Sequence, residues 1–187
     1  MQIVRKIYYI LFDLIQTLVI AGAIFVVVYA FLFRPYQVNG LSMFPTFDNG
    51  EYILTNLVTK RFSEFNRGDI IVFKSPTDKD KDFIKRIIGI AGDTVSVNKG
   101  HIYLNGKELD ESYLPSNYTT AGGSFLEEGV QIVVPEGKYF VLGDNRSNSS
   151  DSREWGFITK DEIIGKSFFV YWPLNKVKMV EHVEINP

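Results

Sequence analysis

Residues 94–106 read Thr-Val-Ser-Val-Asn-Lys-Gly-His-Ile-Tyr-Leu-Asn-Gly, and they indicate the fold class more clearly than any other segment. Two short runs rich in apolar residues, 94–97 and 101–104, are separated by Asn98-Lys99-Gly100, and Asn105-Gly106 follows the second run. Asn-Gly between apolar runs is typical of a β-hairpin, because both central residues of a type I′ turn need a positive φ angle. The segment therefore predicts successive antiparallel strands.

Other short apolar runs extend this pattern along the chain, at residues 70–73, 83–88, 138–142 and 167–172. Charged or turn-forming residues precede several of these runs, as in the loop 77–82. Strands at this spacing without long helices between them predict an antiparallel sandwich or barrel. The predicted fold class is therefore mainly β.

Two segments of this region are expected to be irregular or helical. Residues 110–128, rich in Ser, Thr, Gly and Asn, predict a long irregular insertion of unassigned role. Thr159 and Glu162 have the spacing of a capping box, Ile163-Ile164 follow, and Gly165 is a stop signal. We therefore expect one short helix after Thr159.

The N-terminal segment has a different character, because Leu14 to Phe33 are twenty residues without a charge. At about 1.5 Å per residue, a helix of this length spans roughly the 30 Å core of a bilayer. Arg5 and Lys6 before the span, against Arg34 after it, favour a cytoplasmic N-terminus. We expect Pro35 to end the helix.

The resulting domain prediction is a cytoplasmic N-terminus and single-pass membrane anchor over residues 1–34, and an extracytoplasmic domain over residues 35–187. A cleaved secretory signal is one alternative, because Ala21-Gly22-Ala23 resembles a cleavage site, but ten more apolar residues follow it. A buried helix of a soluble protein is the other alternative.

Composition excludes several kinds of site. The 187 residues include no cysteine, which excludes a disulfide scaffold, a zinc–thiolate site and a cysteine nucleophile. A formal charge of −2 argues against a nucleic-acid partner. An EF-hand calcium loop starting at Asp144 fails, because Arg146 stands where an oxygen ligand is needed. No metal or cofactor is expected.

The first candidate for chemistry is Ser42, which lies in Asn39-Gly40-Leu41-Ser42-Met43-Phe44-Pro45-Thr46, nine residues past the apolar span. Pro45 favours an extended Phe44, and Gly40 permits a sharp turn or a close approach. A serine held between such constraints has a fixed direction, which a nucleophile needs. The alternative is an incidental serine in a loop close to the membrane.

A serine nucleophile needs a base. His101, in a predicted strand, and His182, in a charged tail, have no nearby carboxylate arranged to orient them, so we expect both to be structural or solvated. Lys85 lies inside the apolar run 83–88. Burial lowers the pKa of a lysine, and the neutral amine can accept a proton. The alternative is that Lys85 extends its ammonium to water.

Strand alternation separates Lys85 from its neighbour. Lys85 and Arg86 point to opposite faces of a strand, so one can face a site while the other faces solvent or a carboxylate.

The third segment is unusually polar and runs from Gly143 to Gly156 as Gly-Asp-Asn-Arg-Ser-Asn-Ser-Ser-Asp-Ser-Arg-Glu-Trp-Gly. Such residues bond to the backbone and to one another, and can hold a loop rigidly beside a site. We expect ion pairs among Asp144, Arg146, Asp151 and Arg153 to fix this loop. A plain polar surface loop is the alternative.

Together, these segments resemble the bacterial type I signal peptidases, which are membrane-anchored serine proteases that remove signal peptides from exported proteins. The single N-terminal span resembles the Gram-positive style of this family. The resemblance covers most of the chain after the span and rests on four ordered motifs: 42–46, 67–73, 85–89 with Gly92-Asp93, and 143–156.

The resemblance implies roles for seven residues. Ser42 would be the nucleophile, with its backbone N–H in the oxyanion hole, and Lys85 the general base. Ser149 would hydrogen-bond and orient the lysine. Four further residues would buttress the site: Asp144, Arg146, Asp151 and Arg153.

The same resemblance implies a β-rich catalytic body on the membrane surface, with membrane lipid and signal-peptide-bearing precursors as partners. Cleavage would pass through an acyl-enzyme, after sites with small residues at positions −1 and −3, typically Ala-x-Ala. Some members carry a serine two residues before the nucleophile that assists the oxyanion hole. This chain has Gly40 there, as in the Gram-positive variant, so the resemblance does not assign a second oxyanion donor.

Two other functions remain as alternatives. A membrane-tethered binding module would keep the motifs without turnover, although the intact Ser42 and Lys85 weigh against it. A self-cleaving Ser–Lys protein of the repressor type is the other, but the N-terminal span argues against it, since such chains begin with a DNA-binding segment.

Overall fold

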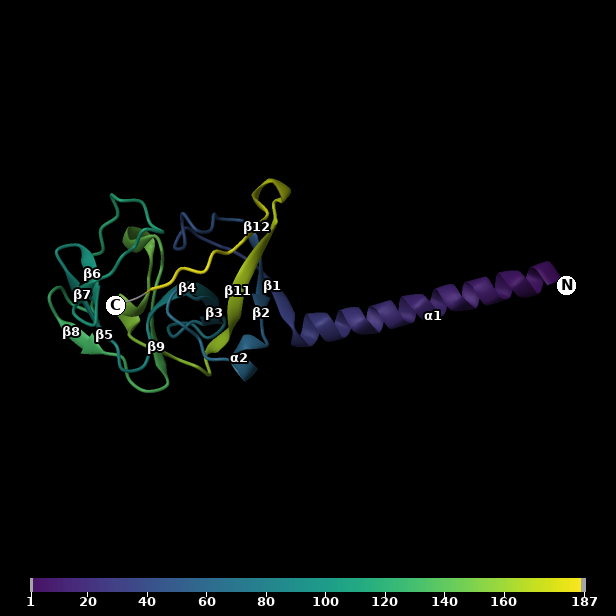
Figure 1. Cartoon of the computed structure of the whole chain (residues 1–187), viewed down its shortest axis with the longest axis horizontal. Helices are drawn as coiled ribbons and strands as arrows, with labels where there is room; N and C mark the ends of the chain where they lie inside the picture. The colour runs from purple at the N-terminus through teal and green to yellow at the C-terminus, as the bar shows by residue number, and fades with distance from the viewer. Residues whose placement is uncertain (1, 186–187) are drawn as a thin grey trace.

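The computed structural model describes residues 2–185. A long helix, α1 (Gln2–Phe31), projects from a body of antiparallel strands (Figure 1). The predicted fold class, a mainly β body with one N-terminal apolar helix, is confirmed.

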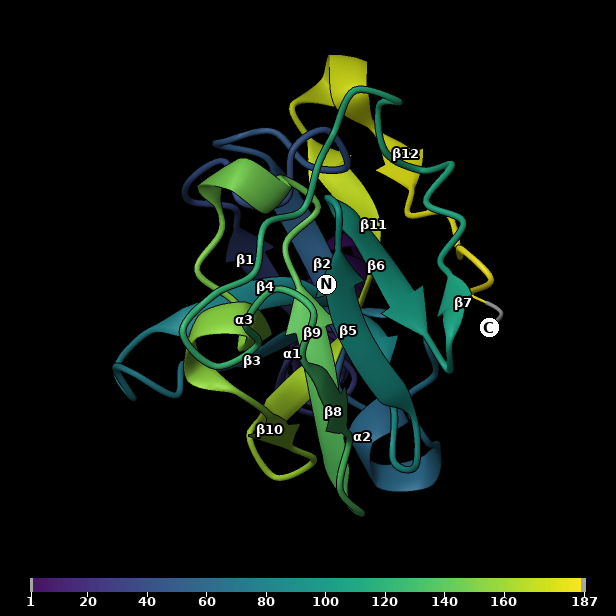
Figure 2. The ribbon, with the colours of Figure 1, turned by 90° about the vertical axis from the view of Figure 1, so that its left-hand side faces the viewer.

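The body contains two sheets in which all paired strands are antiparallel. The larger sheet has the order β1 (Phe33–Gln37), β2 (Tyr52–Asn56), β11 (Ile163–Trp172), β3 (Ile70–Lys74), β4 (Asp82–Gly89), β9 (Lys138–Leu142) and β10 (Ile158–Thr159), and β12 (Lys178–Met179) pairs with β11. The smaller sheet has the order β7 (Lys107–Glu108), β6 (His101–Leu104), β5 (Thr94–Asn98) and β8 (Gln131–Val133). Figures 1 and 2 show this smaller sheet at the end of the body away from α1.

Four short helical segments complete the described chain: α2 (Thr59–Phe62), η1 (Arg146–Asn148), α3 (Ser152–Trp155) and η2 (Leu174–Lys176). As predicted, residues 110–128, all of which the structure describes, form no named helix or strand. This insertion connects β7 to β8.

The hairpin predicted over residues 94–106 is confirmed. Val95 lies opposite Leu104 and Val97 opposite Ile102, and these four side chains are fully buried. The turn residues Lys99 and Asn105 have φ angles of 51° and 53°, each followed by a glycine with positive φ, as a type I′ turn requires.

The short helix expected after Thr159 is wrong. β10 ends at Thr159, a turn follows, and β11 begins at Ile163, which pairs with Phe73 of β3. The Glu162 carboxylate does accept the Thr159 N–H at 2.9 Å, but this contact closes a turn between strands. The β-branched pair Ile163-Ile164 joins the sheet because β3 supplies a backbone partner that is distant in sequence.

The apolar helix ends two residues earlier than its sequence suggested. α1 stops at Phe31, and Phe33 begins β1, so the expected boundary between residues 34 and 35 falls inside a strand. Pro35 and the residue before it disfavour helix, and the strand is the edge of its sheet, where a residue without an N–H is tolerated.

Three groups of buried side chains form the core, and one of them positions the candidate nucleophile. Met43 and Phe47, on either side of the turn after Ser42, are fully buried against Ile53, Ile70 and Val170 of the larger sheet. The loop between β1 and β2 is therefore fixed to the sheet close to Ser42.

Candidate active site

Ser42 lies on the loop that connects β1 to β2. Gly40 has a φ angle of 102°, and its N–H donates to the Asn49 side chain at 2.8 Å, which closes the loop on itself. The Ser42 carbonyl accepts the backbone N–H of Asn145 at 3.0 Å. The serine backbone is thus held from its own loop and from the loop after β9.

Lys85 lies in β4 and points at this serine. Its side chain is only 4% exposed, and its Nζ lies 2.7 Å from Ser42 Oγ and 2.9 Å from the Ile84 carbonyl oxygen. The alternative in which Lys85 extends to water is wrong, because the described residues enclose it.

Burial also changes the acidity of this lysine. Loss of solvation lowers the pKa of Lys85 from 10.5 to about 8, and the negative charges of Asp151 and Asp144 oppose that shift. The neutral fraction of the amine near neutral pH is therefore much larger than for a lysine in water, and a neutral amine 2.7 Å from a hydroxyl can accept its proton.

A cavity of about 260 Å³ opens beside Ser42 and Lys85. Apolar side chains contribute much of its lining, from the end of β1 and from β2, β3 and β4: Val38, Ile53, Val72, Phe83 and Ile84. Tyr36, Asn39 and Asp82 add polar groups. This cavity can hold small side chains next to the serine oxygen.

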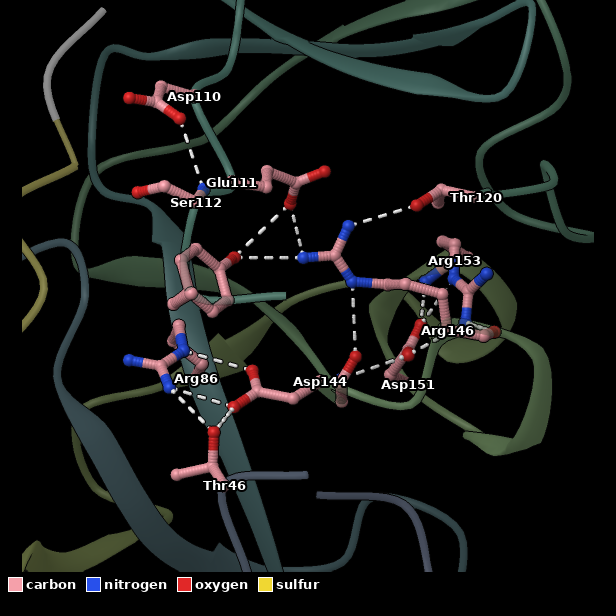
Figure 3. A network of polar contacts seen from close by, with 12 residues as sticks. Thr46, Arg86, Asp110, Glu111, Ser112, Thr120, Asp144, Arg146, Asp151 and Arg153 are labelled. Carbon is pink, nitrogen blue, oxygen red and sulfur yellow. Dashed lines mark hydrogen bonds and ion pairs between the residues drawn. The ribbon is translucent and has the colours of Figure 1, made fainter. Parts of the chain in front are cut away.

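Arg86, the neighbour of Lys85, points to the opposite face and meets a carboxylate, as strand alternation allowed. Its Nε and Nη2 donate to the two oxygens of Asp144 at 2.9 and 2.7 Å, and both side chains are 1% exposed (Figure 3). The Thr46 hydroxyl also donates to Asp144. This pair joins β4, the Ser42 loop and the loop after β9.

The ion pairs expected within the polar loop are correct for one pair and wrong for the other two residues. Arg153 Nε donates to Asp151 at 2.8 Å, and Asp151 accepts the Gly143 N–H at 3.1 Å. Asp144 instead pairs with Arg86, and Arg146 pairs with a carboxylate of the insertion. These partners lie far away in sequence, so proximity within the loop did not reveal them.

Arg146 binds the insertion 110–128. Its guanidinium donates to Glu111, to the Tyr113 hydroxyl at 2.9 Å and to the Thr120 hydroxyl at 2.9 Å, and its Nε donates to the Gly143 carbonyl at 3.1 Å (Figure 3). The insertion, which had no assigned role, thus supplies polar partners to the loop beside Ser42.

The hydrogen bond predicted from Ser149 to Lys85 is not formed. Ser149 Oγ is buried and has no hydrogen-bond partner among residues 2–185. The side chain lies against Gly143, where an added Cβ would come within 2.2 Å of Ser149 Oγ and 2.5 Å of the Ser42 carbonyl oxygen. Lys85 instead bonds to Ser42 and to the Ile84 carbonyl.

Each histidine does have a carboxylate nearby, but both histidines are partly solvated and lie away from the site, in line with the expectation that they are structural or solvated. His101 Nδ1 is 3.0 Å from Glu108, and His182 Nδ1 is 3.5 Å from Asp69. Both histidines are about half exposed, and the described residues that line the cavity include neither of them. They do not compete with Lys85 for the role of base.

Several site residues were not selected from sequence. Arg86 carried a usable signal, because a second cation directly after Lys85 in an apolar strand needs a carboxylate partner. Glu111, Tyr113 and Thr120 carried none, since they lie in an irregular segment with no pattern that points toward residue 146.

The sequence is similar to known signal peptidases. The family model for signal peptidase, peptidase S26, matches residues 11–172. Signal peptidase I S of Bacillus subtilis is 42% identical over 168 residues, covering 87% of this chain and 90% of the relative. Signal peptidase IB of Staphylococcus aureus is 36% identical over 179 residues, covering 90% and 93%.

A solved signal peptidase I of Enterococcus faecalis V583 covers 56% of this chain and 97% of its own, at 34% identity and a TM-score of 0.47. The extent of the family match and the identity to full-length relatives place this sequence in a family of serine endopeptidases. The chain belongs to the signal peptidase family, peptidase S26.

Proposed function

We propose that this chain cleaves signal peptides from exported precursors with Ser42 as the nucleophile and Lys85 as the general base. The observation that carries this assignment is the 2.7 Å contact between the Ser42 hydroxyl and the amine of Lys85, a residue that is 4% exposed. A lysine in this setting does what histidine does in other serine proteases, because its lowered pKa leaves part of it neutral.

The reaction then proceeds in two steps. The neutral Lys85 amine takes the Ser42 proton while Oγ attacks the scissile carbonyl carbon, and the Ser42 backbone N–H supports the developing oxyanion. Lys85 gives the proton to the leaving amine, which departs and leaves an ester on Ser42. The Lys85 amine then activates a water molecule that hydrolyses the acyl-enzyme.

A second oxyanion donor does not come from Gly40. Its N–H is engaged by the Asn49 side chain at 2.8 Å, and glycine has no hydroxyl to offer. One oxyanion donor is commonly worth about 100-fold or more in kcat, so the Ser42 N–H alone still contributes substantially.

The cavity beside Ser42 supports a preference for small residues at positions −1 and −3. Alternate residues of an extended peptide point to the same side, so these two side chains would enter the cavity together while position −2 points away. A volume of about 260 Å³ accommodates the two alanine side chains of an Ala-x-Ala site, and bulky residues such as Ile53 and Phe83 form part of its wall.

Helix α1 supports attachment to a membrane. Its side chains are mostly exposed and apolar on all sides, which suits lipid and not water. The uncharged part after Asp13, residues 14–31, is about 27 Å long, close to the thickness of a bilayer core. In this proposal residues 1–34 form a cytoplasmic N-terminus and single-pass anchor, and residues 35–187 form the extracytoplasmic domain.

The experiment that tests the proposal is cleavage of one model precursor with an Ala-x-Ala site by the full-length chain in detergent. Wild type is expected to release a mature product with a new N-terminus, and Ser42→Ala and Lys85→Ala to release none. The nucleophile and the base act together, so loss of either group typically lowers the rate by several orders of magnitude.

Two matched controls make the result specific. Ser147→Ala removes an exposed serine of the polar loop, and Lys138→Ala removes a lysine of β9 that does not line the cavity. Both are expected to retain cleavage. Undiminished processing by Lys85→Ala would refute the assignment of the base.

A further inference from the structure

Tyr113 lies between two buried guanidinium groups. The Arg86 guanidinium carbon is 4.4 Å from the centre of the Tyr113 ring, a cation–π contact. Arg146 donates to the Tyr113 hydroxyl at 2.9 Å, and that hydroxyl donates to Glu111 at 3.2 Å. Figure 3 shows Arg86 and Arg146 within this network of polar contacts. A single side chain of the insertion therefore contacts both arginines.

The cluster around this tyrosine has balanced charge. It contains three guanidinium groups and three carboxylates, paired as Arg86 with Asp144, Arg153 with Asp151, and Arg146 with Glu111. The Arg146 side chain is 1% exposed, so an unpaired charge there would be costly. Of the three carboxylates, Glu111 is the one that the insertion supplies.

Each arginine is connected to one residue of the Ser42–Lys85 pair. Arg86 follows Lys85 in β4, so the direction of one side chain constrains the other through the strand. Arg146 Nε holds the Gly143 carbonyl at 3.1 Å, in the loop whose Asn145 N–H holds the Ser42 carbonyl at 3.0 Å. A shift of either guanidinium would thus reach Lys85 or Ser42.

We propose that Glu111 and Tyr113 are positioning residues. They hold Arg86 against Asp144 and Arg146 against the 143–145 loop, and so keep the Lys85 amine within hydrogen-bonding distance of the Ser42 hydroxyl. Neither residue touches the reacting atoms. The proposal rests on the proposed function of Ser42 and Lys85, and it adds that two residues of the insertion position the groups that hold this pair.

The first test uses Tyr113→Phe and Tyr113→Leu in the full-length chain with the same model precursor. Tyr113→Phe keeps the ring over Arg86 but loses the hydroxyl, and we expect a fall in kcat of about fivefold with KM unchanged. Tyr113→Leu loses the ring as well and is expected to lose more. Tyr118→Phe, a tyrosine of the same insertion that is outside this cluster, is expected to match wild type.

The second test is the pH profile of Glu111→Gln. The charged groups that face Lys85 are Asp151 and Asp144, which raise its pKa, and Arg153 and Arg86 pair with them. Without Glu111, Arg146 is drawn toward Asp144 and offsets its charge. The rising limb of kcat/KM against pH is therefore expected to move to lower pH. Glu127→Gln, an exposed carboxylate of the insertion, should leave it in place.

The pH profile separates positioning from a merely structural role. If Glu111→Gln and Tyr113→Phe lose activity only in proportion to their loss of folded protein, with the pH limb and kcat per folded molecule unchanged, the positioning role is overturned. A shift of the rising limb of Glu111→Gln to higher pH overturns the positioning role as well. A wild type that does not cleave, or a Ser42→Ala variant that does, overturns the proposed function and with it this role.

Discussion

Lys85 owes its chemistry to its surroundings. In water a lysine is almost fully protonated at neutral pH, whereas burial of the amine beside Ser42 lowers its pKa from 10.5 to about 8. Asp151 and Asp144 limit this shift, because their negative charges stabilise the ammonium. The two opposing effects leave a base that is weak enough to be neutral in part and strong enough to take a proton.

The sign of the pH dependence follows directly. Below the pKa the ammonium has no lone pair and cannot accept the Ser42 proton, so kcat/KM is low. As pH rises through about 8 the neutral fraction increases, and kcat/KM is expected to rise tenfold per pH unit below the pKa and then level off.

Among the structural elements, β4 carries Lys85, and the loop after β9 holds the backbone of Ser42. Gly143 begins this loop, and its Cα faces both Ser149 and the Ser42 carbonyl. The loop fits against the nucleophile only because residue 143 has no side chain.

Gly143→Ala is therefore expected to lower kcat/KM by about 100-fold, since displacement of the Ser42 backbone by even 1 Å spoils the reacting geometry. The added Cβ would lie 2.5 Å from the Ser42 carbonyl oxygen, a distance that forces one of the two loops to move. Initial rates on the model precursor measure the effect. Gly22→Ala, where nothing lies within 4 Å, is the control and should match wild type. Wild-type rates for Gly143→Ala would show that the contact is not tight.

Elements built from local signals were predictable, and those that depend on distant partners were not. The strands at 94–106 follow from the turns at Asn98-Lys99-Gly100 and Asn105-Gly106 and from alternating apolar residues, all within a few positions of each other. The segment after Thr159 has a helix-start pattern, yet Ile163 pairs with Phe73, ninety residues earlier in the chain. Local propensity is weak against such a sheet partner.

The site residues, too, were predictable where the signal is local and unpredictable where the partner is distant in sequence. Ser42 and Lys85 were selected from their motifs, and the structure brings them within 2.7 Å of each other. Arg146 was expected to pair inside its own loop, but its partner Glu111 comes from an irregular insertion. The orienting contact expected from Ser149 is absent among residues 2–185, because the hydroxyl packs against Gly143.

At the scale of the whole molecule, the body and α1 have different surfaces. The body buries apolar side chains in three clusters, whereas the apolar side chains of α1 are exposed. Figure 1 shows α1 projecting from the body. Residues 32–41 connect the end of α1 to Ser42, so in the proposed membrane-anchored arrangement Ser42 stays close to the level at which the helix would leave the lipid. The apolar segment of a membrane-inserted precursor ends near the same level.

The topology is open to a direct test because the chain has no cysteine. In intact cells, Ser147→Cys, in the exposed part of the polar loop, is expected to react with a membrane-impermeant maleimide. Lys6→Cys, before the apolar span, is expected to react only after the membrane is disrupted. The reverse pattern, or labelling of both positions in intact cells, would contradict a single span with a cytoplasmic N-terminus.

The central claim, that a buried and partly neutral Lys85 takes the Ser42 proton, is tested most directly by kcat/KM of the wild-type chain from pH 5 to pH 10. The account predicts a single rising limb with an apparent pKa near 8, well below the value of about 10.4 for a free lysine. A rate that is flat from acid to neutral pH, or a limb near that of free lysine, would contradict it.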